Sequence, residues 1–187
     1  MMVNARLASG LLARALAMAP AMTPSPAPAA SATAINKEAN AVMARLYEKH
    51  PEAKKMAAQA KAILIFPTIY KAGFMFGAQY GEGVLRKGNQ SVAYYNTVAA
   101  SYGWQAGGQA FGYALFFMND GALSYLDKSG GFEVGVGPSI VVMDEGAGKS
   151  TTSSTVTQDI YAFIFDQKGL MAGAGLQGSK ISKIDKK

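Results

Sequence analysis

The chain has 187 residues, 50% of them hydrophobic, with no cysteine and a single histidine, His50. This length fits one domain with a sizeable core, and the inventory excludes disulfides, thiolate catalysis, Cys/His zinc sites and any Ser-His-Asp arrangement built away from residue 50. The 18 Lys and Arg residues against 12 Asp and Glu give a net charge of +6, which favours anionic partners without identifying one.

Residues 1–33 differ in composition from the rest of the chain. An apolar run from Leu11 to Met22, interrupted by Arg14, precedes the stretch TPSPAPAASA, which contains Ala-x-Ala sites at 27–29 and 30–32. This arrangement predicts a secretion signal and a Pro/Ala linker, with a disordered tail or an artificial extension as the alternatives. The apolar run is too short for a membrane span. We therefore expect export to the periplasm or cell envelope and no transmembrane span.

Residues 34–187 are predicted to form a single domain that begins with two helices. Apolar residues recur on one helical stripe from Ile35 to Tyr47, and Asn36 can cap the start of this helix. Pro51 breaks the pattern and suits the first position of a second helix. The apolar face of that second helix runs from Ala53 to Ala60.

The periodicity then changes to that of β-strands. AILIF forms a short buried strand that Pro67 is expected to end, and residues 71–88 alternate in the manner of a strand. Further strands are expected at 91–98, 104–117, 132–143, 160–165 and 169–178. Residues 166–169 read as a hairpin turn, and Asn119 as the cap of a short helix. The prediction is a mainly β, α+β fold: an antiparallel β-barrel or strongly curled sheet, with about three helices packed on its surface.

The stretch VVMDEGAGKSTT, residues 141–152, looks like a strand running into a phosphate-binding loop. That loop requires glycine at position 143, where this chain has Met143. The residues after Lys149 also lack the apolar stripe of the helix that would hold the phosphate. The stretch therefore predicts a polar connection between strands and no nucleotide site. Asp144 and Glu145 lack further ligands nearby, so a solvated turn is expected in place of a metal site.

Other classes of function have little support in the sequence. An enzyme would have only Asp144, Glu145 and scattered hydroxyls to work with, so no catalytic activity and no cofactor are expected. Trp104 and its aromatic neighbours fit a packed core better than a surface that stacks nucleic-acid bases. A barrel carrying a small apolar ligand would need an open interior, whereas the aromatic strands favour a filled one. A scaffolding role in the envelope, with unidentified protein partners, stays open.

Blocks spread over most of the domain occur in the order found in the SYLF domain family. They are KAILIFP (61–67), KAGF (71–74), YGEGVL (80–85), QAGGQ (105–109), LFFMN (115–119), DIYAF (159–163) and KGLMAGAGLQG (168–178). The similarity runs from about residue 36 to residue 184. The chain therefore resembles a SYLF domain over nearly its whole predicted domain.

The resemblance implies a non-catalytic lipid-binding module, which recognises phosphoinositide headgroups in eukaryotic members, and a β-barrel core with surface helices. Some eukaryotic members also bind actin, but no motif in this sequence indicates that activity. Bacterial relatives are commonly exported and often lipid-anchored through a cysteine after the signal. This chain has no cysteine, so a soluble periplasmic protein is the simpler expectation.

Membrane contact in eukaryotic relatives is attributed to the N-terminal part of the domain, which resembles residues 36–61 here. We expect anionic lipid headgroups to meet a basic face made of Lys37, Arg45, Lys49, Lys54, Lys55 and Lys61. The alternative is that these are the solvated sides of two amphipathic helices. A second candidate surface consists of Lys149, Lys180, Lys183, Lys186 and Lys187. Each cation near an anionic surface contributes roughly 1 kcal/mol and is screened by salt, so weak, reversible binding is expected.

Overall fold

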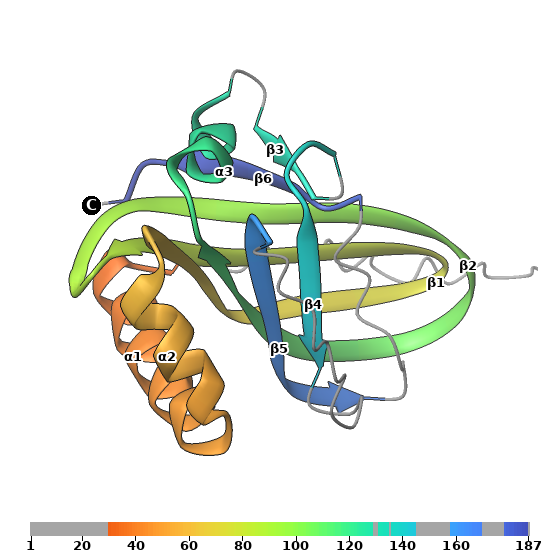
Figure 1. Ribbon diagram of the computed structural model, residues 1–187. Coiled ribbons are helices and arrows are strands. Elements are labelled where there is room, and N and C mark those ends of the chain that lie inside the picture. Colours follow the sequence, from red (N-terminus) through yellow and green to blue (C-terminus); the bar gives the residue numbers. More distant parts are fainter. Residues whose placement is uncertain (1–29, 129–130, 135, 145–157, 170–177, 187) are drawn as a thin grey trace, which may run out of the picture.

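The computed structural model describes residues 30–128, 131–134, 136–144, 158–169 and 178–186. Its elements are α1 (Ala32–Lys49), α2 (Pro51–Gln59), β1 (Ala62–Lys87), β2 (Gln90–Phe117), α3 (Asp120–Ser124), the 3-10 turn η1 (Tyr125–Asp127), β3 (Phe132–Glu133), β4 (Ile140–Asp144), β5 (Ile160–Gly169) and β6 (Lys180–Ile184). The predicted α+β fold, a strongly curled sheet with three helices packed on it, is confirmed (Figure 1).

The sheet is organised around β2. Along one edge, β2 pairs with β1 in a single antiparallel ribbon that runs from Ala62 opposite Phe117 to Lys87 opposite Gln90. The other edge of β2 is shared between β5 and β6, both antiparallel to it. β3 pairs antiparallel with β6, and β4 pairs parallel with β5. The expected antiparallel sheet therefore contains one parallel pair.

The ribbon of β1 and β2 folds back on itself, as Figure 1 shows at the end where both strands turn together. Next to the register shift between Phe74 and Phe76, a Cβ atom added to Gly73 would lie 2.3 Å from the carbonyl oxygen of Phe76. Further along, a Cβ on Gly83 would lie 2.4 Å from the carbonyl oxygen of Ile65. Glycine allows this close approach because it has no side chain. The beginning and the end of β1 are thereby packed against each other.

Each face of the sheet carries its own hydrophobic core. Successive strand residues point to opposite faces, so Leu64 belongs to one core and Ile65 to the other. The buried residues of α1 and α2 pack on the face of Ile65. Ala122 of α3 and Leu126 of η1 pack on the face of Leu64. The helical layer of α1 and α2 and the α3–η1 region therefore lie on opposite faces of the sheet.

Two expected strand ends are wrong. Pro67 does not end a strand, because β1 continues through it with a register shift between Phe66 and Ile69 that accommodates the proline. Similarly, residues 91–98 and 104–117 belong to the one continuous strand β2. The long ribbon stays intact where local sequence rules predict interruptions, because β1 and β2 pair with each other along almost their full length.

The C-terminal strands also differ from the prediction. The expected strand 132–143 is divided into β3 and β4. Residues 166–169 continue β5 and form no hairpin turn; Asp166 takes a left-handed φ of 54° where the pairing with β2 shifts register. β6 was not predicted, and most of the expected strand 169–178 lies outside the described residues.

Candidate functional site

The predicted basic face lies on and beside the helical layer. Lys37, Lys49, Lys54 and Lys55 are exposed on α1 and α2. Lys61 lies between α2 and β1, with its Nζ atom 4.0 Å from Oδ2 of Asp120. The exposed carboxylates of Glu38, Glu48 and Glu52 lie on the same two helices. The cations of the helical layer therefore alternate with negative charges.

Arg45 is already engaged within the fold. Its guanidinium donates to Oδ2 of Asp166 at 2.5 Å, joining α1 to β5. The two side chains line an open cleft of 240 Å³ between α1 and the sheet, together with residues such as Thr68 and Phe111. A headgroup that approached Arg45 would have to compete with this carboxylate.

Lys180 and Lys183 of β6 line a pocket on the other side of the molecule. Its volume is 530 Å³, and its lining is completed by Leu126, Asp127, Lys128, Gly131 and Ser182. We call this site the lysine pocket, after Lys128, Lys180 and Lys183. The Nζ atom of Lys128 lies 3.2 Å from the centroid of the Tyr125 ring, a cation–π contact that orients the side chain. The sequence interpretation missed Lys128, because a lone lysine after a short helix carries no local signal.

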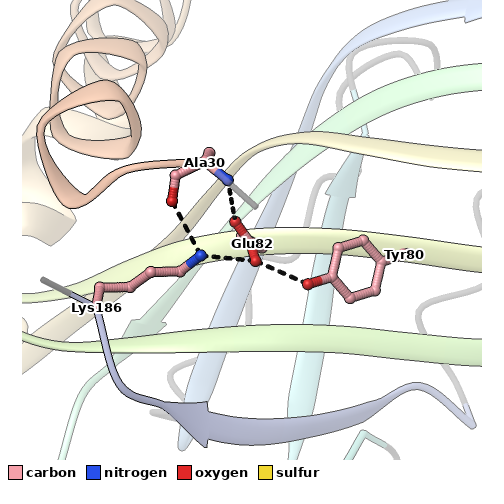
Figure 2. A network of polar contacts seen from close by, with 4 residues as sticks. All are labelled: Ala30, Tyr80, Glu82 and Lys186. Atoms are coloured by element: carbon pink, nitrogen blue, oxygen red, sulfur yellow. Dashed lines mark hydrogen bonds and ion pairs between the residues drawn. The ribbon is translucent and has the colours of Figure 1, made fainter. Parts of the chain in front are cut away.

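Lys186 does not belong to the predicted free basic surface. Its Nζ atom forms an ion pair with Oε1 of Glu82 at 2.8 Å, and both side chains are only 9% exposed. The same Nζ donates to the carbonyl oxygen of Ala30 at 2.9 Å. Tyr80 donates its hydroxyl to Oε1 of Glu82 at 2.8 Å, and the Ala30 N–H donates to Oε2 at 3.1 Å. Figure 2 shows Glu82 at the centre of these contacts, which we call the Glu82 network.

The Glu82 network shifts the titration of two of its members. Burial acts to raise the pKa of Glu82, but hydrogen bonds from Lys186 and Tyr80, together with the positive charge of Lys186, bring that pKa below its ordinary value. Burial raises the pKa of Tyr80 to about 12, assisted by the hydrogen bond to Glu82 and by its negative charge. The network therefore holds Glu82 as a carboxylate and Tyr80 as a neutral donor at neutral pH.

Asn36 does not cap α1 as predicted. The N-cap is Ser31, whose Oγ accepts from the N–H of Ala34 at 3.2 Å. Asn36 lies within the helix and connects it to the sheet: its Nδ2 donates to the Tyr94 hydroxyl at 2.7 Å, and its Oδ1 accepts from Ser91 Oγ at 2.7 Å. The cap of α3 is as predicted, since Asn119 Oδ1 accepts from the backbone N–H of the third residue after it at 2.8 Å.

The remaining predicted positions fall outside the description. Lys149 and Lys187 lie outside the described residues, as do the residues from Glu145 onward in the phosphate-loop-like stretch. The side chain of Trp104 is also not described. Within the part of the chain that the structure describes, no three His, Cys, Asp or Glu side chains are grouped so as to hold a metal ion. Nor does any helix of that part have the length and hydropathy needed to cross a membrane.

Comparison with protein families and with curated proteins places the C-terminal half of the chain beside a known family. Residues 98–187 match the family model described as "Ysc84: Las17-binding protein actin regulator", and no curated protein matches the chain. The matched segment begins within β2 and includes β3 to β6, so it contains all three lysines of the lysine pocket and also Lys186. α1, α2 and β1 lie before it.

Proposed function

We propose that the chain belongs to the Ysc84 (SYLF) domain family, whose model matches residues 98–187, and that it is a non-catalytic module that binds anionic lipid headgroups at a membrane surface. The observation that supports it is the lysine pocket. Three lysines from two separate segments line one open concavity there, with Asp127 as the one carboxylate of the described lining. A concave group of cations binds a headgroup phosphate better than a flat group of cations does, because several ammonium groups can contact the same anion.

The expected affinity is low and depends on salt. Each lysine near an anionic bilayer contributes about 1 kcal/mol, and this contribution falls off within a Debye length. The hydroxyl of Ser182, also in the pocket lining, can add a hydrogen bond to a phosphate oxygen. A headgroup with several phosphates, such as a phosphoinositide, would bind more tightly than one with a single phosphate.

The lysine pocket is a better candidate than the helical layer. The two surfaces lie on opposite faces of the sheet, so one flat bilayer cannot contact both at once. On the helical layer, Glu38, Glu48 and Glu52 separate the lysines, and Arg45 is paired with Asp166. These carboxylates would meet an anionic bilayer together with the cations and weaken the attraction.

Reversing two charges of the lysine pocket is expected to abolish most of the binding. The variant Lys180→Glu/Lys183→Glu removes about 2 kcal/mol of attraction, which lowers the affinity for phosphatidylglycerol-containing vesicles by at least about thirtyfold. The matched control Lys54→Glu/Lys55→Glu changes the net charge by the same amount on the helical layer and is expected to retain binding. Co-sedimentation with these vesicles and with pure phosphatidylcholine vesicles, at two salt concentrations, measures both.

Three results would contradict this assignment. Equal losses in the two variants would mean that net charge alone determines binding. A loss confined to the Lys54/Lys55 variant would place the contact on the helical layer. Equal binding of the wild-type chain to both kinds of vesicle would remove the headgroup as the recognised group.

Export to the periplasm or cell envelope is part of the same proposal. It is supported by the apolar run and the Ala-x-Ala sites within residues 1–33. The described helices, none of which could span a membrane, are compatible with a protein that meets a membrane from its surface.

An envelope scaffold that binds a protein partner is the second candidate. Phe76, Tyr80 and Val98 are exposed by 70%, 47% and 38%, and Tyr80 pairs with Val98 across the ribbon. Exposed apolar groups on one face can mark a protein interface. A photo-crosslinking residue at position 76 is expected to capture a defined envelope protein if this candidate holds, whereas one at the exposed position 142 is not.

The carrier alternative has weaker support. The side chains of Phe66, Phe111 and Tyr113 are buried in the core of the sheet. Stacked and tilted ring contacts join them, with centroids 5.0 Å apart for Phe66 and Tyr113. Aromatic side chains packed in this way occupy the space that an apolar ligand would need.

A further inference from the structure

We propose that the mature chain begins at Ala30, and that its α-ammonium group binds the carboxylate of Glu82. This inference rests on the export part of the proposed function, because it requires removal of the leader. Its basis is the position of Ala30, whose backbone nitrogen lies 3.1 Å from Oε2 of Glu82 and whose carbonyl oxygen accepts from Lys186 at 2.9 Å. Ala30 immediately follows the Ala-x-Ala site at 27–29, where a signal peptidase would cut.

The structure distinguishes between the two Ala-x-Ala sites of the sequence. Cleavage after Ala29 keeps Ala30 in the Glu82 network and keeps Ser31, which caps α1 through its Oγ atom. Cleavage after Ala32 would remove both residues together with the first residue of α1. Loss of a serine cap destabilises a helix by itself, and Glu82 and Lys186 would each lose a hydrogen-bond partner. The fold is therefore compatible with the first site and damaged by use of the second.

Hydrolysis of the Ala29–Ala30 bond changes the chemistry of the contact. Water adds across the peptide bond, so that Ala29 leaves with a carboxylate and Ala30 gains an ammonium group with three donors. A cation thereby replaces the amide N–H of Ala30, whose nitrogen lies 3.1 Å from Oε2 of Glu82. Hydrogen bonds between ionised partners are roughly twice as strong as neutral ones.

The charges around Glu82 can accommodate this second cation. Lys186 and Tyr80 contact Oε1, whereas the nitrogen of Ala30 contacts Oε2, so each cation has an oxygen of its own. A free ammonium group just before α1 would otherwise oppose the helix dipole, which favours negative charge at that end. The carboxylate of Glu82 offsets this unfavourable interaction and fixes the new N-terminus against β1.

The first test locates the cleavage. The full chain is produced with its own leader in a Gram-negative host, and the intact mass of the envelope form is measured after fractionation. The mass of residues 30–187 is expected. An envelope form that begins at Thr33 or elsewhere would overturn this proposal while export stands. A full-length chain that stays in the cytoplasm would overturn both the cleavage site and export. The vesicle assay is independent of either outcome.

The second test isolates the ammonium charge. The processed chain is prepared with a free or an acetylated Ala30, each with Glu82 or with Glu82→Gln, because acetylation keeps the N–H donor and removes the charge. We expect Glu82→Gln to lower the melting temperature more in the free chain than in the acetylated one. Equal decreases would overturn the ammonium–carboxylate pair. The acetylated chain controls for the structural role of Glu82 toward Lys186 and Tyr80, which is the same in both.

Discussion

Gly83→Ala is expected to lower the free energy of unfolding by about 3 kcal/mol, at the upper end of the usual cost of overpacking. An added Cβ would lie 2.4 Å from the carbonyl oxygen of Ile65 and 2.7 Å from the ring of Phe66. The ring can move, but the carbonyl belongs to the backbone of β1, which is paired with β2. The methyl group can therefore be accommodated only by separating the two ends of β1.

Gly108→Ala is the matched control, because it lies in the same ribbon without a close neighbour. The nearest atom to its added Cβ is the carbonyl oxygen of Lys71 at 3.9 Å, an ordinary van der Waals contact. Chemical denaturation of both variants measures the difference, and the control is expected to change the free energy of unfolding by less than about 1 kcal/mol. Equal losses would mean that β-propensity, and not the close approach at Gly83, determines the effect.

Local periodicity was sufficient to predict the helices and most strand positions. The apolar stripe from Ile35 to Tyr47 and the proline at position 51 gave the two N-terminal helices, α1 and α2. The alternation in residues 71–88 and the glycines gave a curled sheet. These signals are reliable because they depend only on neighbouring residues and on which face of an element is buried.

The strand ends could not be predicted, because signals that depend only on neighbouring residues do not include the effect of a partner strand. A proline such as Pro67 normally ends a strand, yet β1 tolerates it where the pairing with β2 shifts register. Residues 166–169 likewise have the composition of a hairpin turn, but they continue the strand β5. In both cases pairing with a distant segment overrides local preference, and the sequence of one segment does not report what its partner strand does.

Prediction of the candidate site was limited even more by contacts between segments that are distant in the sequence. Lys180 and Lys183 were predicted as part of a loose basic surface, but the lysine pocket also requires Lys128, which the fold brings beside them. Lys186 was assigned to that surface and is instead paired with Glu82. These residues lie far apart along the chain, so composition indicated the charge and only the fold showed which lysines are available.

The strand β6 connects the lysine pocket with the Glu82 network. Two lysines of the lysine pocket, Lys180 and Lys183, belong to this short strand. Lys186, which pairs with Glu82, lies two residues after the end of the strand. β6 pairs with β2 and with the two-residue strand β3, and the ion pair of Lys186 with Glu82 adds a side-chain contact just beyond its C-terminal end. A change at Lys186 should therefore affect stability, although the residue takes no part in the proposed headgroup contact.

In the chain that still carries its leader, so that Ala30 has no ammonium group, Lys186→Met is expected to lower the free energy of unfolding at pH 7 by about 3 kcal/mol, because it leaves the largely buried carboxylate of Glu82 without the Lys186 cation. Methionine keeps most of the apolar length of the side chain. The pKa of Glu82 is lowered in the fold, so its contribution is present above the unfolded value of about 4.3 and is lost as the pH falls through the folded pKa. The difference between wild type and variant should therefore shrink in acid.

Lys183→Met is the control for this prediction, since it removes an exposed lysine from the same end of the chain. It is expected to change stability by less than about 0.5 kcal/mol and to weaken vesicle binding, whereas Lys186→Met should weaken stability and leave the vesicle affinity of the folded protein unchanged. Denaturation curves at pH 7 and pH 3 and the co-sedimentation assay separate these effects. Equal stability losses in the two variants, or a loss for Lys186→Met that is the same at both pH values, would show that the ion pair with Glu82 does not account for the stability lost in Lys186→Met.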